Sequence, residues 1–455
     1  MLTGGLLLQQ PADVVHEIPP TIDQDITVIL GAGVIGLSTA YYLALSLKEN
    51  GTCSLPSRPK VIVVEPSHGI CPGASGGATG GLGDFGFSEA VSPLGEFSYG
   101  LHKELASAYQ GRKNWSFRDQ NVFRVTPKNF KGDLLPPDSW APVPPLETNL
   151  SSLPDWIKTS DHWSVQLLAP VPHSSHIDPA RFCQFLYKQC QDLGVQFRFN
   201  STVTSVQQAD DRESFRSVTV ESSTPSQTTK VIPCNALVIA GGPWSANLFS
   251  SLFPEAVVKL RMNTTWSAGN YVRVRNPRPE KPDEQSNSTQ VFLNNVLPDS
   301  NAMDITSFLD GSLYLGGWGA IPEVLPEYAD NVEPQQAEID SLLKMARQHL
   351  SLEPDEMLEV FDIGRCYRPQ AVPNRPIVTR VKWSLLGYLE DSPRMAHSCP
   401  RGPVEPKPAV VGGLYINTGH DSDGVTLGPG SGKVMSELLL GRMPSVSVSE
   451  LDLES

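Results

Sequence analysis

The sequence predicts an α/β fold in which a Rossmann-like nucleotide-binding domain, discontinuous in the chain, accompanies a second domain built on an antiparallel sheet. Three observations predict it. An apolar run near the start leads directly into a glycine-rich turn and a helix-like stretch. A second buried-type strand ends in an acid, and strand-like runs separated by turns fill the region 249–360. The first two features are typical of a dinucleotide site, and the third is typical of an antiparallel sheet.

The first element is the strand and turn ITVILGAGVIG. Gly31 allows the tight strand-to-helix turn, Gly33 lets the backbone approach a pyrophosphate, and Gly36 lets the helix pack closely on the strand. Val34 and Ile35 of the turn are also cofactor-binding candidates, and a helix-like stretch, LSTAYYLALSL, follows them. Its free N–H groups and the positive end of its dipole then face the phosphates.

The second strand, KVIVVE at 60–65, ends in Glu65, which is predicted to bind a ribose hydroxyl. Its distance from the last glycine of the turn exceeds the usual spacing of about 20 residues. We interpret residues 50–59, NGTCSLPSRP, as a loop insertion that accounts for the excess.

A second glycine-rich stretch at 71–87, CPGASGGATGGLGDFGF, indicates which dinucleotide is bound. A nicotinamide-binding domain does not need it, whereas a flavin domain needs little side-chain bulk where the chain passes the pyrophosphate and the flavin ring. The alternative is a flexible surface linker. The sequence favours FAD, with four binding candidates here: Ser75, Gly76, Gly77 and Ala78.

Two later elements extend this site. An apolar strand at 234–240 closes in small residues and a tryptophan, and GHDSDGVTLGPGSGK at 419–433 begins a helix that can direct its dipole at the pyrimidine end of the flavin. The cofactor-binding candidates in these and a third segment are Val203, Gly241, Trp244, Asp423, Gly424, Val425 and Thr426.

Taken in order, these motifs resemble the D-amino-acid oxidase superfamily of FAD-dependent oxidoreductases, in its glycine oxidase and sarcosine oxidase branch. The similarity continues through HIDPARFCQFLYKQCQDLGV and FDIGRCYRPQAVPNRPIV, and the stretch 94–123 is similar to fungal members of unassigned substrate. The resemblance implies that a C–N bond of an amino acid or related amine is oxidised by hydride transfer to flavin N5. The products are an imine and, if oxygen is the acceptor, hydrogen peroxide.

The resemblance also implies roles for two residues of CYRPQ. Arg368 stands where relatives hold the substrate carboxylate with a two-pronged guanidinium, a geometry that lysine lacks. The alternative is a structural ion pair. Cys366 stands where some relatives attach the flavin through a thioether, and the alternative is a small buried apolar residue.

Three departures from the family pattern bear on the reaction. Tyr314 takes the place of the lysine that sarcosine oxidases use to activate oxygen, and Thr79–Gly80 replaces a basic residue beside the flavin. A dehydrogenase with another electron acceptor, or a catalytically idle flavoprotein in trafficking or assembly, therefore stays open. Asp423 stands where relatives tend to have a bulky apolar residue, and an acid there either binds a substrate ammonium or faces solvent. Tyr314 and Trp318 are also candidate pocket residues, with core packing as the alternative.

Composition limits the function classes. The net charge of −14 disfavours a nucleic-acid partner, and no apolar run is long enough to span a bilayer. The seven cysteines are scattered, without metal-type pairs, which favours a reducing, cytoplasmic compartment and no metal site. A nicotinamide-dependent dehydrogenase remains the alternative enzyme class.

The expected domain organisation follows from these segments. The N-terminal residues 1–20 are expected to form an arm and residues 443–455 a C-terminal tail. The FAD-binding domain is assigned to 21–90, 173–248 and 361–442, and the substrate domain to 91–172 and 249–360. The partners expected are a small-molecule amine and an electron acceptor.

Overall fold

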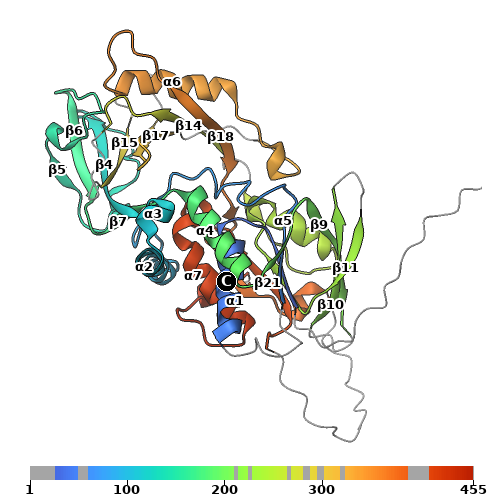
Figure 1. Ribbon diagram of the computed structural model, residues 1–455. Helices are drawn as coiled ribbons and strands as arrows, with labels where there is room; N and C mark the ends of the chain where they lie inside the picture. The colour runs from blue at the N-terminus through green and yellow to red at the C-terminus, as the bar shows by residue number, and fades with distance from the viewer. Residues whose placement is uncertain are drawn as a thin grey trace, which may run out of the picture.

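The strands of this chain form two large sheets, one above the other in the view of Figure 1. The computed structural model describes residues 26–49, 60–209, 214–223, 228–263, 268–279, 287–294, 302–317, 323–387 and 409–453. The predicted arm at 1–20, the interpreted insertion at 50–59 and Trp318 lie outside these residues.

The lower sheet has six strands in the order β20-β21-β12-β1-β2-β8. All neighbours are parallel except β20, which is antiparallel to β21. The strands are β1 (Ile26–Leu30), β2 (Lys60–Val64), β8 (Gln196–Arg198), β12 (Ala236–Ile239), β20 (Ile377–Arg380) and β21 (Gly413–Thr418). Every residue of β1 is buried because both faces of the sheet are covered.

Successive residues of these strands enter two different cores. Ile29 and Val63 pack in the core that contains the helices α1 (Val34–Glu49), α4 (Pro179–Asp192) and α7 (Gly424–Leu439). Val28 and Ile62 point to the opposite face. That face is covered by α5 (Ser245–Leu252) and a three-stranded sheet of β9 (Ser201–Gln208), β10 (Phe215–Ser222) and β11 (Thr229–Pro233). The alternation of strand side chains thus builds a three-layer nucleotide-binding domain.

The upper sheet is larger and mixed. Its main path runs β18-β14-β17-β16-β15-β4-β6-β5, all antiparallel except the parallel pair β15 and β4. The strands are β4 (Arg118–Pro127), β5 (Leu146–Thr148), β6 (Trp163–Ala169), β14 (Ala268–Arg275), β15 (Ser288–Leu293), β16 (Met303–Ser307), β17 (Ser312–Gly317) and β18 (Val360–Tyr367). The short strands β3 (Gly81–Gly83) and β7 (Ser174–His176) join it at β4. β18 lies within the stretch 361–442 that we assigned to the nucleotide-binding domain, but it pairs with β14 in this sheet.

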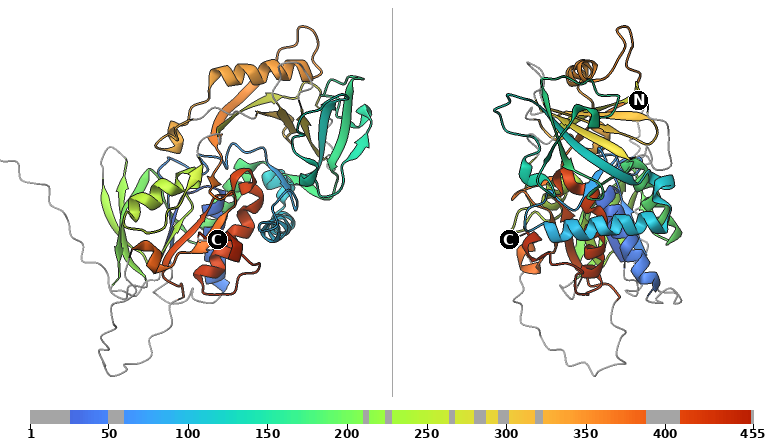
Figure 2. Two further views of the ribbon diagram at one scale, coloured as in Figure 1. Left: turned by 180° about the vertical axis from the view of Figure 1, so that it is seen from behind. Right: turned by 90° about the vertical axis from the view of Figure 1, so that its left-hand side faces the viewer.

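The two faces of the upper sheet differ in chemistry. Val272, Ile305 and Leu315 point to the face that packs on α6 (Gln336–His349). Residues with the opposite parity, including Tyr271, Asp304 and Tyr314, form a polar and aromatic face. Figures 1 and 2 show α6 on the side of this sheet that faces away from α1 and α7. The polar face therefore looks toward the nucleotide-binding domain.

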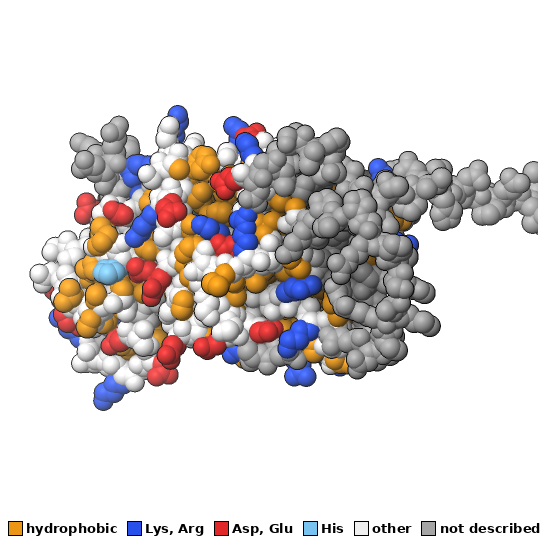
Figure 3. All heavy atoms as spheres, turned by 90° about the horizontal axis from the view of Figure 1, so that it is seen from below, with side chains coloured by type: hydrophobic (Ala, Val, Ile, Leu, Met, Phe, Trp, Pro, Cys, Tyr) orange, Lys and Arg blue, Asp and Glu red, His pale blue; other side chains and the backbone are white. Residues whose placement is uncertain are grey.

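Helices outside the sheets complete the described fold. α2 (Ser92–Ala108) packs against α7, and α3 (Gly111–Trp115) packs against α4. Acidic, basic and apolar side chains are interspersed on the face of the molecule shown in Figure 3. The described part of that face shows no continuous basic stripe of the kind that nucleic-acid binding requires.

Candidate active site

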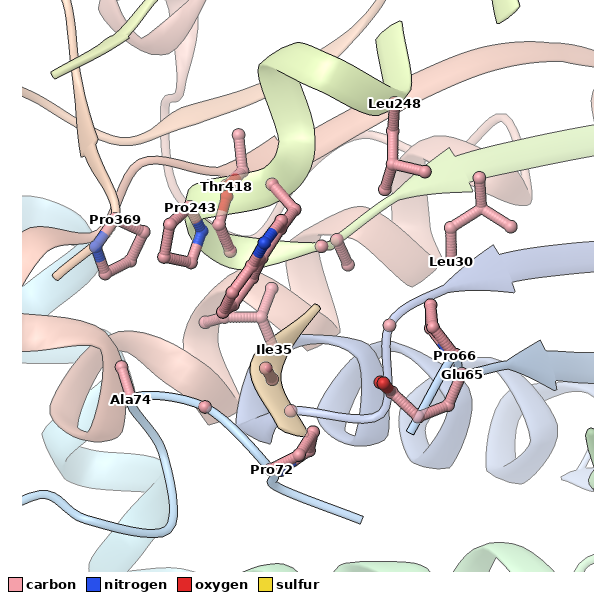
Figure 4. A pocket seen from close by; sticks show the side chains of 18 of the residues that line it. Leu30, Ile35, Glu65, Pro66, Pro72, Ala74, Pro243, Leu248, Pro369 and Thr418 are labelled. Atoms are coloured by element: carbon pink, nitrogen blue, oxygen red, sulfur yellow. Dashed lines mark hydrogen bonds between the residues drawn. The ribbon is translucent and has the colours of Figure 1, made fainter. Parts of the chain in front are cut away.

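A cavity of about 460 Å³ opens at the carboxyl ends of β1, β2, β12 and β21. Figure 4 shows Leu30, Glu65 and Leu248 at one end of it and Ala74 and Pro369 at the other. The sequence-predicted cofactor residues that line it are Gly31, Gly33, Val34, Ile35, Glu65, Ser75, Ala78, Val203, Gly241, Trp244, Gly424 and Val425. The predicted residues absent from its lining are the cofactor candidates Gly36, Gly76, Gly77, Cys366, Asp423 and Thr426 and the catalytic candidates Arg368 and Tyr314.

The glycine-rich turn is shaped by contacts that leave no room for side chains. Gly31 has a φ of +114°, and a Cβ there would lie 2.4 Å from the carbonyl oxygen of Ala240. A Cβ on Gly36 would lie 2.0 Å from the Gly31 carbonyl oxygen, so this glycine brings α1 close to the turn. Gly33 is in the cavity wall, where a Cβ would lie 3.2 Å from Ser75 Oγ.

Glu65 is held in the cavity wall by backbone donors. The N–H of Ala32 donates to its Oε2 at 2.8 Å, and the N–H of Ser67 donates to its Oε1 at 3.0 Å. Burial raises the pKa of this carboxyl, and the two backbone hydrogen bonds oppose the shift. Its carboxylate is therefore fixed in orientation before any ligand binds.

The turn before α7 brings two acids to the other end of the cavity. Asp421 lines the cavity; its Oδ2 accepts a hydrogen bond from Gln370 Nε2 at 3.1 Å, and its Oδ1 has no partner within the described residues. Asp423 stands outside the lining, and burial together with the charge of Asp421 raises its pKa to about 7. The prediction singled out Asp423 and missed Asp421, although both belong to the same GHDSDG motif.

His420, in the same turn, is a neutral structural residue. Its Nε2 lies 2.8 Å from Ser431 Oγ, and burial lowers its pKa to about 3. An imidazole with so low a pKa carries no charge at neutral pH.

Two tyrosines of the polar sheet face cover the second glycine-rich stretch. Tyr271 and Tyr314 stack with ring centroids 5.2 Å apart at 16°. The Tyr314 hydroxyl donates to the carbonyl oxygen of Gly77 at 2.9 Å, and a Cβ on Gly77 would lie 2.7 Å from the Tyr271 ring. Because Ala78 lines the cavity, these rings lie directly beyond its wall.

Arg368 and Cys366 lie near these tyrosines. Cys366 pairs with Gly269 across β18 and β14, which puts it on the polar face, and Arg368 follows the end of β18. Burial raises the pKa of the Cys366 thiol and of the Tyr314 hydroxyl, and the positive charge of Arg368 lowers both. The fold therefore brings Arg368 and Cys366, which belong to one segment of the chain, near Tyr314 of β17.

A comparison with known protein families shows which cofactor this cavity holds. A sequence model described as FAD dependent oxidoreductase matches residues 27–438. The chain belongs to this family of FAD-dependent oxidoreductases. FAD is therefore its cofactor, and the nicotinamide-dependent alternative is wrong.

Individual relatives are distant but cover almost the whole chain. A protein of Schizosaccharomyces pombe that bears the provisional name of oxidoreductase is 24% identical over 437 residues, covering 94% of this chain and 97% of its own. The structure is similar to a glycine oxidase from Geobacillus kaustophilus (TM-score 0.65, 18% identity, 94% of this chain and 98% of that one). It is also similar to an L-proline dehydrogenase from P. horikoshii (TM-score 0.64, 14% identity, 94% and 97%). At these identities the structural likeness shows the fold.

The residues present fit FAD. Gly33 leaves the cavity wall beside the N-terminus of α1 without a side chain, as a pyrophosphate requires. The fixed carboxylate of Glu65 lies at one end of the cavity, and the N-terminus of α7 at the other, where Gly424 and Val425 line it. In this flavoprotein Glu65 would face the ribose, and α7 would face the flavin ring.

Sequence reasoning missed a segment that reaches the FAD cavity from the upper domain. We call residues 323–331 the strap. Its residues Leu325 to Ala329 line the cavity, and Trp244 Nε1 donates to the carbonyl oxygen of Pro326 at 2.7 Å. His68 Nδ1 lies 3.2 Å from Asp330 Oδ2. No glycine pattern or charge spacing marks this segment, because its partners are distant in sequence.

The base of the strap is fixed by Glu323. Its Oε2 accepts hydrogen bonds from the Arg365 guanidinium at 2.6 Å and from the Tyr367 hydroxyl at 2.8 Å. The Arg365 side chain is only 3% exposed and also contacts Glu338 at 3.1 Å. The strap therefore bridges β18 and the FAD cavity of the oxidoreductase.

The backbone of Thr79 has an imidazole beside it. His176 Nε2 lies 3.0 Å from the Thr79 carbonyl oxygen, but burial and the charge of Arg118 lower the pKa of His176 to about 3. This imidazole is neutral. Among the described residues, no helix has both the length and the hydropathy to cross a membrane, and no acidic, histidine or cysteine group is arranged to hold a metal ion.

Proposed function

We propose that this flavoprotein oxidises the C–N bond of an amino acid or related primary or secondary amine that carries a carboxylate. The observation that carries the proposal is the place of Arg368, which follows β18, is electrostatically coupled to Tyr314, and is followed by Pro369 in the wall of the FAD cavity. A guanidinium there can hold a carboxylate in its plane through two hydrogen bonds. Relatives of this fold that act on glycine and proline support an amino-acid substrate.

The chain's own residues supply orientation. Arg368 fixes the substrate carboxylate, and Tyr314, fixed by its hydrogen bond to Gly77, forms one wall of the substrate site. FAD, when bound, accepts the hydride that leaves the substrate carbon. Tyr314 and Tyr271 exclude water from the place where they cover Gly77, which protects the reacting groups from solvent.

Substitution of Arg368 tests the carboxylate role. Arg368→Ala removes both hydrogen bonds to the carboxylate, and Arg368→Lys retains the charge without the planar fork. Since hydrogen bonds to charged groups contribute about 1.5–3 kcal/mol each, we expect kcat/KM for carboxylated amines to fall by roughly 100-fold or more in Arg368→Ala. The kcat/KM of Arg368→Lys should lie between those of the wild type and Arg368→Ala.

The matched control is Arg347→Ala, which removes an exposed arginine on α6. It should leave kcat/KM unchanged. Amines without a carboxylate should be oxidised with the same kcat/KM by the wild type and by the Arg368→Ala, Arg368→Lys and Arg347→Ala variants. An Arg368→Ala protein with unchanged kcat/KM for every carboxylated amine would contradict the proposal.

A dehydrogenase is the second candidate, favoured by Tyr314 and Thr79 at the two positions where the family resemblance places basic groups. Hydrogen peroxide formed in a 1:1 ratio to imine identifies an oxidase. Flavin reduction by the amine without peroxide in air identifies a dehydrogenase. A protein whose flavin is reduced by no amine would be the catalytically idle flavoprotein.

Two modes of cofactor binding are open: covalent attachment of the flavin through the Cys366 thiol, or dissociable FAD. The thiol lies on the polar face beside Tyr314 but outside the lining of the cavity. Acid precipitation separates the two alternatives, because covalent flavin stays with the pellet and dissociable FAD enters the supernatant. Cys366→Ser should release the colour if the thiol forms the bond.

A further inference from the structure

Asp304 is a carboxylate on the polar face of the upper sheet that the proposed function does not use. It lies on β16, opposite Gly316 of β17 and Phe292 of β15, in the middle of the sheet. Its neighbours in sequence, Met303 and Ile305, point into the apolar core on the other face. An acid in such a position is unusual because a charged group loses hydration there.

The sheet provides space for this carboxylate by omitting a side chain. A Cβ on Gly316 would lie 2.3 Å from Asp304 Oδ1 and 3.1 Å from the Tyr314 ring. The carboxylate therefore occupies the volume above Gly316, next to Tyr314.

The carboxylate has few hydrogen-bond partners among the described residues. Gln290 Nε2 lies 3.4 Å from Asp304 Oδ2, and this long hydrogen bond is the single one from another side chain within the described residues. Gln290 in turn lies against β3, where a Cβ on Gly81 would lie 3.3 Å from Gln290 Oε1. A carboxylate can accept about four hydrogen bonds, so most of its capacity remains for a ligand.

The same carboxylate is coupled to Arg368. Burial raises the pKa of Asp304, and the positive charge of Arg368 is the largest influence that lowers it. The positive charge of Arg368 also lowers the pKa of Tyr314 and of Cys366, so it acts on three groups of the polar face. The guanidinium of Arg368 and the carboxylate of Asp304 therefore place one positive and one negative charge on this side of the upper sheet.

We infer that Asp304 binds the substrate's ammonium group while Arg368 binds its carboxylate, so that the site selects amino-acid zwitterions over hydroxy acids, dicarboxylates and simple amines. The inference rests on the proposed function, because it requires Arg368 to face the substrate. The Tyr314 hydroxyl donates to the carbonyl oxygen of Gly77, which fixes the Tyr314 ring beside Asp304. Specificity then arises from charge complementarity at both ends of the substrate.

Binding without turnover gives the sharpest test. The holoenzyme is reduced with dithionite so that no amine can be oxidised, and calorimetry measures the Kd of the best amino-acid substrate and of its 2-hydroxy acid. We expect Asp304→Asn to weaken amino-acid binding by roughly 10-fold or more and to leave the Kd of the hydroxy acid unchanged or tighter. Arg368→Gln should weaken both ligands.

Two further variants keep the test decisive. Gly316→Ala displaces the carboxylate without removing its charge and should reproduce the selective loss, even if Asp304→Asn fails to fold. Asp362→Asn removes another acid from the polar face, where its counter-charge is Arg273, and should change neither Kd.

The possible failures are distinguishable. If Asp304→Asn and Gly316→Ala change both ligands equally, or neither, while Arg368→Gln weakens both, the role of Asp304 is overturned and the proposed function stands. If Arg368→Gln changes neither ligand, the proposed function itself fails.

Discussion

Two glycines of the turn between β1 and α1 serve different purposes. A Cβ on Gly36 would lie 2.0 Å from a backbone oxygen, which cannot move without displacing α1. A Cβ on Gly33 would meet the Ser75 side chain at 3.2 Å, a contact that a small shift relieves. Gly36 is therefore needed for the packing of α1, and Gly33 for access of the cofactor to the cavity wall.

We therefore expect the two alanine variants to separate stability from binding. Gly36→Ala should lower the free energy of unfolding by about 3 kcal/mol, since overpacking against backbone is costly. Gly33→Ala should change it by less than about 1 kcal/mol but weaken FAD at least 10-fold, because its methyl group enters the cavity wall. Urea unfolding and FAD titration measure both quantities. Equal behaviour of the two variants would contradict this division.

Asp423 gives the protein a pH-dependent stability. Burial and the charge of Asp421 raise the pKa of Asp423 from 3.8 to about 7. A group with a raised pKa binds its proton more tightly in the folded state, so its contribution is intact below pH 4 and is lost as the pH rises to 7.

The expected result is that Asp423→Asn becomes more stable relative to wild type as the pH rises. The gain between pH 4 and pH 8 should reach up to about 4 kcal/mol, from a shift of about three pKa units. Urea unfolding of both proteins across this range gives the difference. A difference that stays constant with pH would show that Asp423 titrates normally.

At the scale of elements, alternation along the strands determines where the chemistry lies. In β16, Met303 and Ile305 bury toward α6, and Asp304 and Thr306 therefore point toward the FAD-binding domain. The strap extends from the end of this sheet over the FAD cavity. The upper domain thus contributes the polar face, which we propose binds the substrate, and part of the wall of the FAD cavity.

Loosening the strap should accelerate loss of FAD. Glu323→Gln weakens the bond to Arg365, whose guanidinium is almost completely buried and keeps Glu338 as a partner. We expect about 2 kcal/mol of lost stability and an FAD dissociation rate roughly 10-fold higher. The return of flavin fluorescence on dilution measures that rate. Asp340→Asn, an exposed change on α6, is the control. An unchanged rate in Glu323→Gln would exclude the strap as a cover.

Across the whole molecule, local patterns predicted the FAD-binding domain well. The structure of the apolar runs that end at Leu30 and Val64, and of the glycine-rich turns after them, depends on residues adjacent in sequence. The α/β class and the cofactor could therefore be predicted. The edge of the upper sheet could not be predicted in this way. β18 follows the helix α6 and precedes β20 of the other sheet, and only its pairing with β14 shows where it belongs.

The site was predictable only in part for the same reason. Arg368 and Cys366 were found through a sequence motif, whereas Asp304 and the strap depend on contacts between segments distant in sequence. Asp304 stands in MDITS, a strand that has no motif around it. The charge of Arg368 acts on Asp304 only in the folded protein, because β14 and β17 separate β16 from β18 in the sheet and the two residues are distant in sequence.

The measurement that tests the central claim most directly is anaerobic reduction of the bound flavin by a panel of amino acids. Each amino acid is compared with its decarboxylated amine and its hydroxy acid. We expect one or more amino acids to bleach the flavin absorbance at about 450 nm in preference to the other two classes. Bleaching that is equally fast with amines lacking a carboxylate, or no bleaching by any member of the panel, would contradict it.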